Sequence, residues 1–228
     1  LPKCVSGETI LAIAMTEPDA GSDLAGMRAH AKDMGGHWLL NGTKTYITNG
    51  INSDVVIVAA KTDPENNPHA VGLFLIERGM EGFERGRNLK KMGMKAQDTA
   101  ELFFTDVRVP KENVLGDPSH GFIYLMQGLA EERLIGACGF LSGAHKAFEV
   151  TREFTQQRKV FGKPLSKMQN TEFKMADLRT ELDVAQAYVD QCVAAHNAGL
   201  LTSEDAAKAK LFTSELLCKM VDEGVQLH

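Results

Sequence analysis

Residues 121–153 read GFIYLMQGLAEERLIGACGFLSGAHKAFEVTRE, a stretch without proline that is rich in leucine, alanine and glutamate. These residue types favour a helix, and the stretch is much longer than the average globular helix of about 11–12 residues. Similar stretches follow at 166–198 and from 203 to the chain end, and a Ser-Glu-Asp run opens the last one, as is typical of a helix start. Long consecutive helices predict an antiparallel bundle.

The chain before Leu115 has a different character, because glycine and proline are more frequent there and the apolar runs are short. About seven such runs predict strands, and they lie at 10–15, 28–33, 37–41, 44–48, 55–60, 71–76 and 101–109. Gly35-Gly36 and Asn41-Gly42 are two-residue hairpin signals. Short strands with tight turns indicate a small barrel or sandwich. We therefore expect an α+β protein with a β-domain over residues 1–115 and a helical domain over 116–228.

The composition disfavours several classes of protein. The chain of 228 residues has a net charge of −5 at pH 7, which argues against a general nucleic-acid binder. No apolar run approaches the roughly 18 residues of a transmembrane segment. The four cysteines form no Cys-x-x-Cys pair and the seven histidines show no ligand spacing, so no metal site is expected. A basic run from Arg85 to Lys95 is expected to be the solvated face of a loop.

One charged pair interrupts the apolar pattern of the first long helix. A stripe drawn from Phe122 at about 3.6 residues per turn passes through Leu125. Further along, the same stripe reaches Glu132 and Arg133, whereas Glu131 should face solvent. Unpaired buried charge is costly, so two interpretations stay open. The pair is either a structural ion pair, or Glu132 is a general base whose pKa is raised by burial.

Three motifs in order carry a resemblance to a family. They are TEPDAGSD at 16–23, YITNG at 46–50 and RKVFGKPL at 158–165, and the pieces KAQDTAELFF at 95–104 and ERL at 132–134 match as well. Over essentially the whole chain these motifs resemble the acyl-CoA dehydrogenases, most of all the long-chain branch. That family has an N-terminal helical domain, a middle β-barrel and a C-terminal four-helix domain. The resemblance therefore implies a middle β-domain and part of the helical bundle, in a chain truncated at both ends and without the N-terminal domain.

The resemblance also implies an activity. The family uses FAD to convert acyl-CoA thioesters into trans-2-enoyl-CoA, as a base removes the α-proton and hydride passes from the β-carbon to flavin N5. We expect medium-to-long acyl chains, an electron-transferring flavoprotein as electron acceptor and a homodimer or homotetramer. The expected compartment is the cytoplasm in a bacterium or the mitochondrial matrix in a eukaryote. An acyl-CoA oxidase that uses oxygen, or a non-catalytic scaffold without flavin, remains an alternative.

Site residues follow from the same resemblance. The implied cofactor contacts are Met15, Thr16, Gly21, Ser22, Tyr46, Ile47, Thr48, Arg158, Phe161, Gln169 and Gln226.

Within this set, Thr16 is expected at the edge of the flavin ring, Tyr46 against its face and Thr48 near N5. Ser22 is also expected to contact the CoA portion of the thioester ligand.

The last four cofactor residues are implied to act across a subunit boundary. Arg158 is expected at the pyrophosphate of a neighbouring subunit's FAD, together with Phe161 and Gln169, and Gln226 at another cross-subunit contact. Glu132 is the implied catalytic base, and Arg133 is implied to lie near the base and the substrate.

Overall fold

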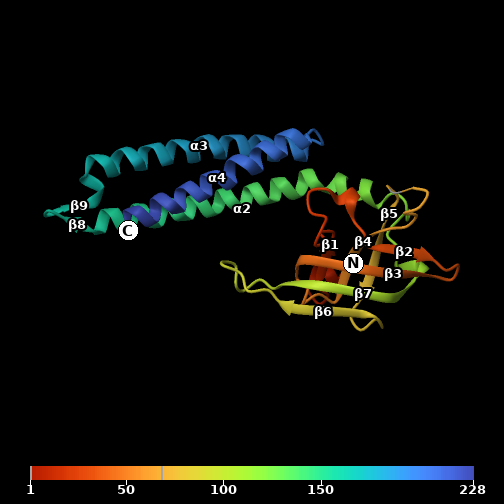
Figure 1. Ribbon diagram of the computed structural model, residues 1–228. Helices are drawn as coiled ribbons and strands as arrows, with labels where there is room; N and C mark the ends of the chain where they lie inside the picture. Colours follow the sequence, from red (N-terminus) through yellow and green to blue (C-terminus); the bar gives the residue numbers. More distant parts are fainter. Residues whose placement is uncertain (1, 68) are drawn as a thin grey trace. The chain divides into compact units, whose positions relative to one another are not determined.

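The computed structural model describes residues 2–67 and 69–228, which form two compact units (Figure 1). The first unit extends to Leu125 and the second covers Met126–His228. The elements of the first unit before the long helix are α1 (Pro2–Ser6), β1 (Leu11–Ala14), η1 (Leu24–Gly26), β2 (His30–Asp33), β3 (His37–Thr48), β4 (Val55–Lys61), β5 (Val71–Glu77), β6 (Phe83–Asn88), β7 (Thr99–Pro110) and η2 (Lys111–Asn113). Together with the long helices this confirms the predicted α+β class.

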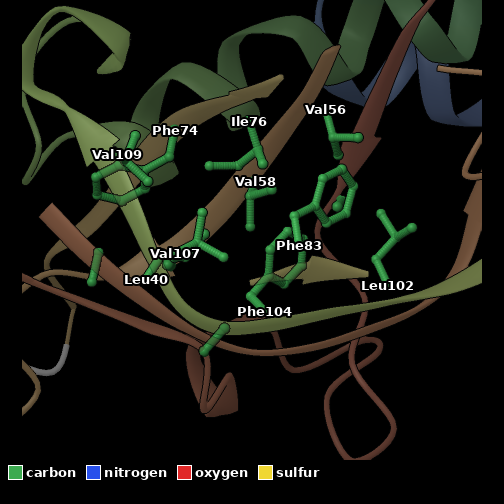
Figure 2. Close-up of a cluster of buried hydrophobic side chains, with 14 of the residues drawn as sticks. Leu40, Val56, Val58, Phe74, Ile76, Phe83, Leu102, Phe104, Val107 and Val109 are labelled. Atoms are coloured by element: carbon green, nitrogen blue, oxygen red, sulfur yellow. The ribbon is translucent and has the colours of Figure 1, made fainter. Parts of the chain in front are cut away.

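The first unit is built around one curled sheet. Its strands follow the order β1-β4-β2-β3-β7-β6, and β5 pairs with β4. Alternate side chains of these strands point inward, and Figure 2 shows them gathered in one cluster. Phe83 and Phe104 belong to this cluster and stack with ring centroids 5.1 Å apart. Burying each large apolar side chain contributes about 1.5–3 kcal/mol, so this cluster is the main source of stability for the unit.

The predicted hairpin at Asn41-Gly42 is wrong, whereas the one at Gly35-Gly36 is confirmed. Strands β2 and β3 pair across Gly35-Gly36 with Asp33 opposite Trp38. The predicted strands 37–41 and 44–48 are a single strand, β3, with a register shift between Leu40 and Gly42. Gly42 has φ 146°, and a Cβ there would lie 2.5 Å from the Cβ of Ala29. Glycine is needed at this position for a close approach of two chain segments rather than for a turn.

Replacing Gly42 by alanine tests this explanation. We expect Gly42→Ala to lower the free energy of unfolding by about 2–4 kcal/mol, since backbone strain adds to overpacking. Gly36→Ala is the matched control, because a Cβ at Gly36 meets no atom within 4 Å. Denaturant unfolding followed by fluorescence of the single tryptophan, Trp38, measures both variants. An equal effect of the two substitutions would contradict the packing role of Gly42.

Strand β6 was not among the predicted strands. It contains part of the basic run, whose charges hide the pattern that a half-buried strand usually shows. The expectation that Arg85 lies on the solvated face of a loop is wrong. Its Nε donates to the carbonyl of Gly50 and its Nη2 to the carbonyl of Ser53, both at 3.0 Å. Burial lowers the pKa of Arg85, and the neighbouring Arg78 adds to this effect. The basic run is therefore partly structural.

The second unit consists of long antiparallel helices, as predicted. Its elements are α2 (Gly121–Gln157), which starts in the first unit, β8 (Lys159–Val160), β9 (Lys163–Pro164), η3 (Leu165–Lys167), α3 (Gln169–Asn197) and α4 (Ser203–Leu227). Leu141 of α2, Leu182 of α3 and Leu216 of α4 belong to a second core cluster. Thr202 caps α4 by accepting a hydrogen bond from the amide of Asp205. Among the described residues, no helix combines the length and apolar character needed to cross a membrane.

Candidate functional site

An irregularity in β3 turns an aromatic side chain outward. The pairing of β3 with β7 shifts register between Lys44 and Ile47, and Tyr46 takes the left-handed conformation with φ 58°. As a result Lys44 and Thr45 are both buried, whereas Tyr46 is 69% exposed. The next residue, Ile47, is buried, and Thr48 after it is again exposed. Tyr46 and Thr48 therefore share one side of the strand, which offers a flat ring and a hydroxyl.

The segment of Met15 and Thr16 lies beside this part of β3. The amide of Thr45 donates to the carbonyl of Thr16 at 2.9 Å, so the two segments are joined next to Tyr46. Met15 and Thr16 are both half-buried. The structure thus brings together five of the predicted cofactor residues: Met15, Thr16, Tyr46, Ile47 and Thr48. Ile47 lies in the hydrophobic core rather than on the exposed face.

A buried ion pair holds the two segments together. Lys44 is fully buried, and its Nζ lies 2.8 Å from Oε1 of Glu17 and donates to the carbonyl of Met15 at 2.9 Å. Burial lowers the pKa of Lys44, while the hydrogen bond and charge of Glu17 oppose this shift. The carboxylate of Glu17 also accepts hydrogen bonds from the amides of Arg28 at 2.6 Å and Ala29 at 3.1 Å. Two charged side chains therefore tie three chain segments together.

Gly21 and Ser22 lie further from this cluster. They follow a tight turn in which the amides of Glu17 and Ala20 donate to each other's carbonyls. Gly21 and Ser22 are both exposed. A cavity of about 280 Å³ borders the turn, and it is lined by Glu17, Pro18, Asp19, Arg28, Ala29, His30, Gly42 and Thr43. Neither Gly21 nor Ser22 is among these lining residues.

Asp98 fixes the loop that follows β3. Its buried carboxylate accepts hydrogen bonds from the amides of Ile51 at 2.7 Å and Asn52 at 3.3 Å and from the side chain of Asn52 at 2.9 Å. The side chain of Gln97 donates to Asn49, which has φ 61°. Lys44, Glu17 and Asp98 are not among the site residues that the sequence predicts. A lysine inside an otherwise strand-like run was the one available signal.

The predicted apolar stripe of α2 has the wrong phase. In the helical unit the buried residues of α2 are Leu134, Ala137, Leu141, Ala144, Phe148, Thr151 and Thr155. Glu132 is exposed and Arg133 is half-buried, so Glu132 is not a carboxyl buried in that stripe. The reason is that Phe122 and Leu125 belong to the first unit, so the start of α2 packs against other partners than the rest. Among the described residues, neither Glu132 nor Arg133 takes part in an ion pair.

Glycines leave open the side of α2 that carries Glu132. A Cβ at Gly128 would lie 3.8 Å from Oε1 of Glu132, which is an ordinary contact. A Cβ at Gly139 would meet no atom within 4 Å, and one at Gly136 only the ring of Phe140 at 3.7 Å. These glycines are therefore not close-packing sites against other described parts of the chain. The carboxylate of Glu132 projects from a helix surface that has little side-chain cover.

The remaining predicted cofactor residues gather at one end of the helical unit. Arg158 directly follows α2, Gln169 begins α3, and Phe161 lies between β8 and β9 with φ 50° and 97% exposure. Gln226 lies near the end of α4, where the ring of His228 stacks on Phe154 of α2 with centroids 4.2 Å apart. All four predicted residues are exposed. Arg158 and Phe161 both lie in the segment that connects α2 and α3, and an arginine and an exposed aromatic ring are suited to an anionic, aromatic ligand.

The described residues contain no group of three or more histidine, cysteine, aspartate or glutamate side chains suited to a metal ion. The two clusters around Tyr46 and Glu132 belong to different units, and each is described within its own unit.

Two models of known protein families match the chain, and together they cover most of its length. Residues 12–107 match the family model described as "Acyl-CoA dehydrogenase, middle domain", and residues 119–228 match "Acyl-CoA dehydrogenase, C-terminal domain". The chain is 50% identical over its whole length to the mitochondrial long-chain specific acyl-CoA dehydrogenase of Mus musculus, of which it covers 54%. It therefore spans about half the length of the curated relatives that it matches.

Two solved structures are similar as well. The crystal structure of an acyl-CoA dehydrogenase from Geobacillus kaustophilus is 44% identical with a TM-score of 0.97, and the match covers 100% of this chain and 60% of that one. A structure described as the electron transferring flavoprotein of Acidaminococcus fermentans is 36% identical with a TM-score of 0.94, covering 99% of this chain and 59% of that one.

Proposed function

The chain belongs to the acyl-CoA dehydrogenase family, and from this premise we propose that the protein uses FAD to oxidise medium-to-long-chain acyl-CoA thioesters to trans-2-enoyl-CoA. The observation that carries the proposal is the outward-facing Tyr46 beside Thr16 and Thr48 on the irregular stretch of β3. The chain spans about half the length of the curated relatives that it matches. The activity, substrates and partners are therefore proposals.

The residues around Tyr46 fit a flavin ring. Tyr46 offers an exposed aromatic face for stacking, and Thr16 and Thr48 offer hydroxyls beside it. When bound, FAD supplies an acceptor for hydride from the β-carbon of the substrate. The protein's contribution is a rigid platform, since the Thr45–Thr16 hydrogen bond and the Lys44–Glu17 pair hold both segments. Ser22, which is exposed after the tight turn, is proposed to contact the CoA portion of the thioester ligand.

Glu132 is the proposed catalytic base. A carboxylate that removes a proton from carbon needs an open approach and no competing partner, and the glycines around Glu132 and its lack of an ion pair within the described residues support this role. Glu132 Oε would take up the α-proton, and substrate binding would exclude water from it. Arg133, the neighbouring half-buried cation, is proposed to lie near the substrate.

Arg158, Phe161, Gln169 and Gln226 are proposed to bind the FAD of a neighbouring subunit in a homodimer or homotetramer. Their exposure at one end of the helical unit, rather than in its core, supports a role toward a second chain. Arg158 would pair with the pyrophosphate through its planar, bidentate guanidinium group.

The role of Arg158 predicts a loss of cofactor affinity. We expect Arg158→Gln to raise the Kd for FAD about 10- to 100-fold, because a hydrogen bond to a charged group contributes about 1.5–3 kcal/mol. Lys163→Gln, which removes an exposed charge from the same hairpin, should leave the Kd nearly unchanged. Fluorescence titration of the apoprotein with FAD measures both values. Equal losses in both variants would point to a nonspecific charge effect instead.

A turnover assay tests the proposed activity. Purified protein loaded with FAD is given octanoyl-CoA or palmitoyl-CoA with an electron-transferring flavoprotein, which is the acceptor that the family resemblance implies. We expect 2-enoyl-CoA in proportion to the electrons transferred and little peroxide. One peroxide per product without the acceptor would instead identify an oxidase. A mitochondrial or bacterial cytoplasmic setting is proposed from the relatives.

A further inference from the structure

We infer that Lys44 and Glu17 are positioning residues, whose buried ion pair sets the distance between the Met15–Thr16 segment and the outward-facing Tyr46 and thereby shapes the flavin platform. This inference rests on the proposed function, because the platform matters only if flavin binds there. It adds to that function two residues that touch no proposed ligand themselves.

The contacts of Lys44 lead directly to the platform. Its Nζ donates to the carbonyl of Met15 at 2.9 Å, next to Thr16. In sequence Lys44 is two residues before Tyr46, at the start of the register shift of β3. Because Lys44 and Thr45 both point inward, the strand leaves its regular alternation and Tyr46 emerges on the exposed side. Lys44 therefore connects the segment of Thr16, which is proposed to lie at the edge of the flavin ring, with the strand of Tyr46, which is proposed to lie against the face of that ring.

Glu17 fixes the other end of the pair. Its carboxylate accepts three hydrogen bonds, from Lys44 and from the amides of Arg28 and Ala29. In addition, its backbone amide and carbonyl are both bonded to Ala20. The segment after Met15 is thus bonded through both backbone and side chain. A side chain bonded in this way is held in one position relative to β2 and β3.

Stability alone does not explain a buried ion pair. Replacing such a pair by apolar residues of similar volume is often neutral or stabilising, because the desolvation of two charges offsets their attraction. The pair fixes the position of a neighbouring backbone group, because Nζ of Lys44 donates both to the Glu17 carboxylate and to the carbonyl of Met15. An apolar pair could fill the same space without fixing the carbonyl of Met15.

The double variant Lys44→Met/Glu17→Gln separates positioning from stability. We expect it to fold, as judged by far-ultraviolet circular dichroism and Trp38 fluorescence, and to bind FAD about 10- to 100-fold more weakly, since small displacements of positioning groups have effects of this size. The FAD that does bind should show an altered visible circular dichroism band. Lys111→Met/Asp33→Asn, which removes a more exposed ion pair from the same unit, is the matched control and should retain the parent's affinity and spectrum.

Glu17→Gln alone is the second variant. The one oxygen that it keeps can still accept from Lys44 and the amide of Ala29, which both bond Oε1 of Glu17, whereas the amide of Arg28 loses its acceptor Oε2. This variant should weaken FAD binding in the same direction. Parent-like FAD affinity and visible circular dichroism in folded Glu17→Gln or in the folded double variant would overturn the inference while leaving the proposed function intact. Absence of FAD binding by the parent protein would overturn the proposed function and this inference with it.

Discussion

Glu132→Gln should slow the reduction of bound flavin by acyl-CoA about 10²- to 10⁴-fold, which is the typical contribution of a general base. The amide has the size of the carboxylate but does not accept the α-proton. Because Glu132 is exposed and outside the core cluster of the helical unit, the substitution should not affect folding. Stopped-flow measurement of flavin bleaching under anaerobic conditions gives the rate, and equilibrium titration gives FAD and ligand affinity, both of which should be retained.

The neighbouring glutamate provides the control. Glu131 is also exposed on α2, so Glu131→Gln makes the same change in charge one residue away. We expect parent-like reduction in this variant. Full reduction in Glu132→Gln would refute the assignment of the base, and equal slowing in both variants would indicate a general effect of charge on this helix.

Lys44→Met should destabilise the first unit by about 3 kcal/mol or more, because it leaves the carboxylate of Glu17 buried without its cation. The remaining amide bonds from Arg28 and Ala29 satisfy part of that charge, so the lower end of the usual range of about 3–5 kcal/mol is expected. Urea unfolding followed by Trp38 fluorescence reports on this unit, since Trp38 is buried in its core.

Neutralising both partners should reverse much of this loss. The double variant Lys44→Met/Glu17→Gln removes the unpaired charge, so its unfolding free energy should lie closer to that of the parent than that of Lys44→Met does. A double variant as unstable as Lys44→Met would show that packing around the lysine, rather than charge, is responsible. An unchanged stability of Lys44→Met would contradict the buried ion pair itself.

Local sequence signals predicted those parts of the fold that local chemistry decides. The Gly35-Gly36 hairpin followed from turn geometry, and the long helices followed from composition and capping residues. Asn41-Gly42 carries the same kind of signal but lies inside β3, because Gly42 is required by its approach to Ala29, thirteen residues earlier in the chain. Such a tertiary contact is invisible in a short window of sequence.

The candidate site was predictable only through the family resemblance. The resemblance identified Thr16, Tyr46 and Thr48, and the structure brings their segments together. Helical phase alone put Glu132 in a buried stripe, whereas the stripe begins at Leu134, because the partners α3 and α4 decide which side of α2 is covered. Lys44 was missed because its burial depends on the register shift in β3 and on Glu17 from a separate segment.

The most direct test of the central claim is an anaerobic titration of the FAD-loaded protein with palmitoyl-CoA and with octanoyl-CoA. An acyl-CoA dehydrogenase with the proposed site should show bleaching of the visible flavin band by both thioesters, and the two amplitudes would rank the chain lengths. Tightly bound FAD whose visible band is unchanged by either thioester would contradict the proposed function.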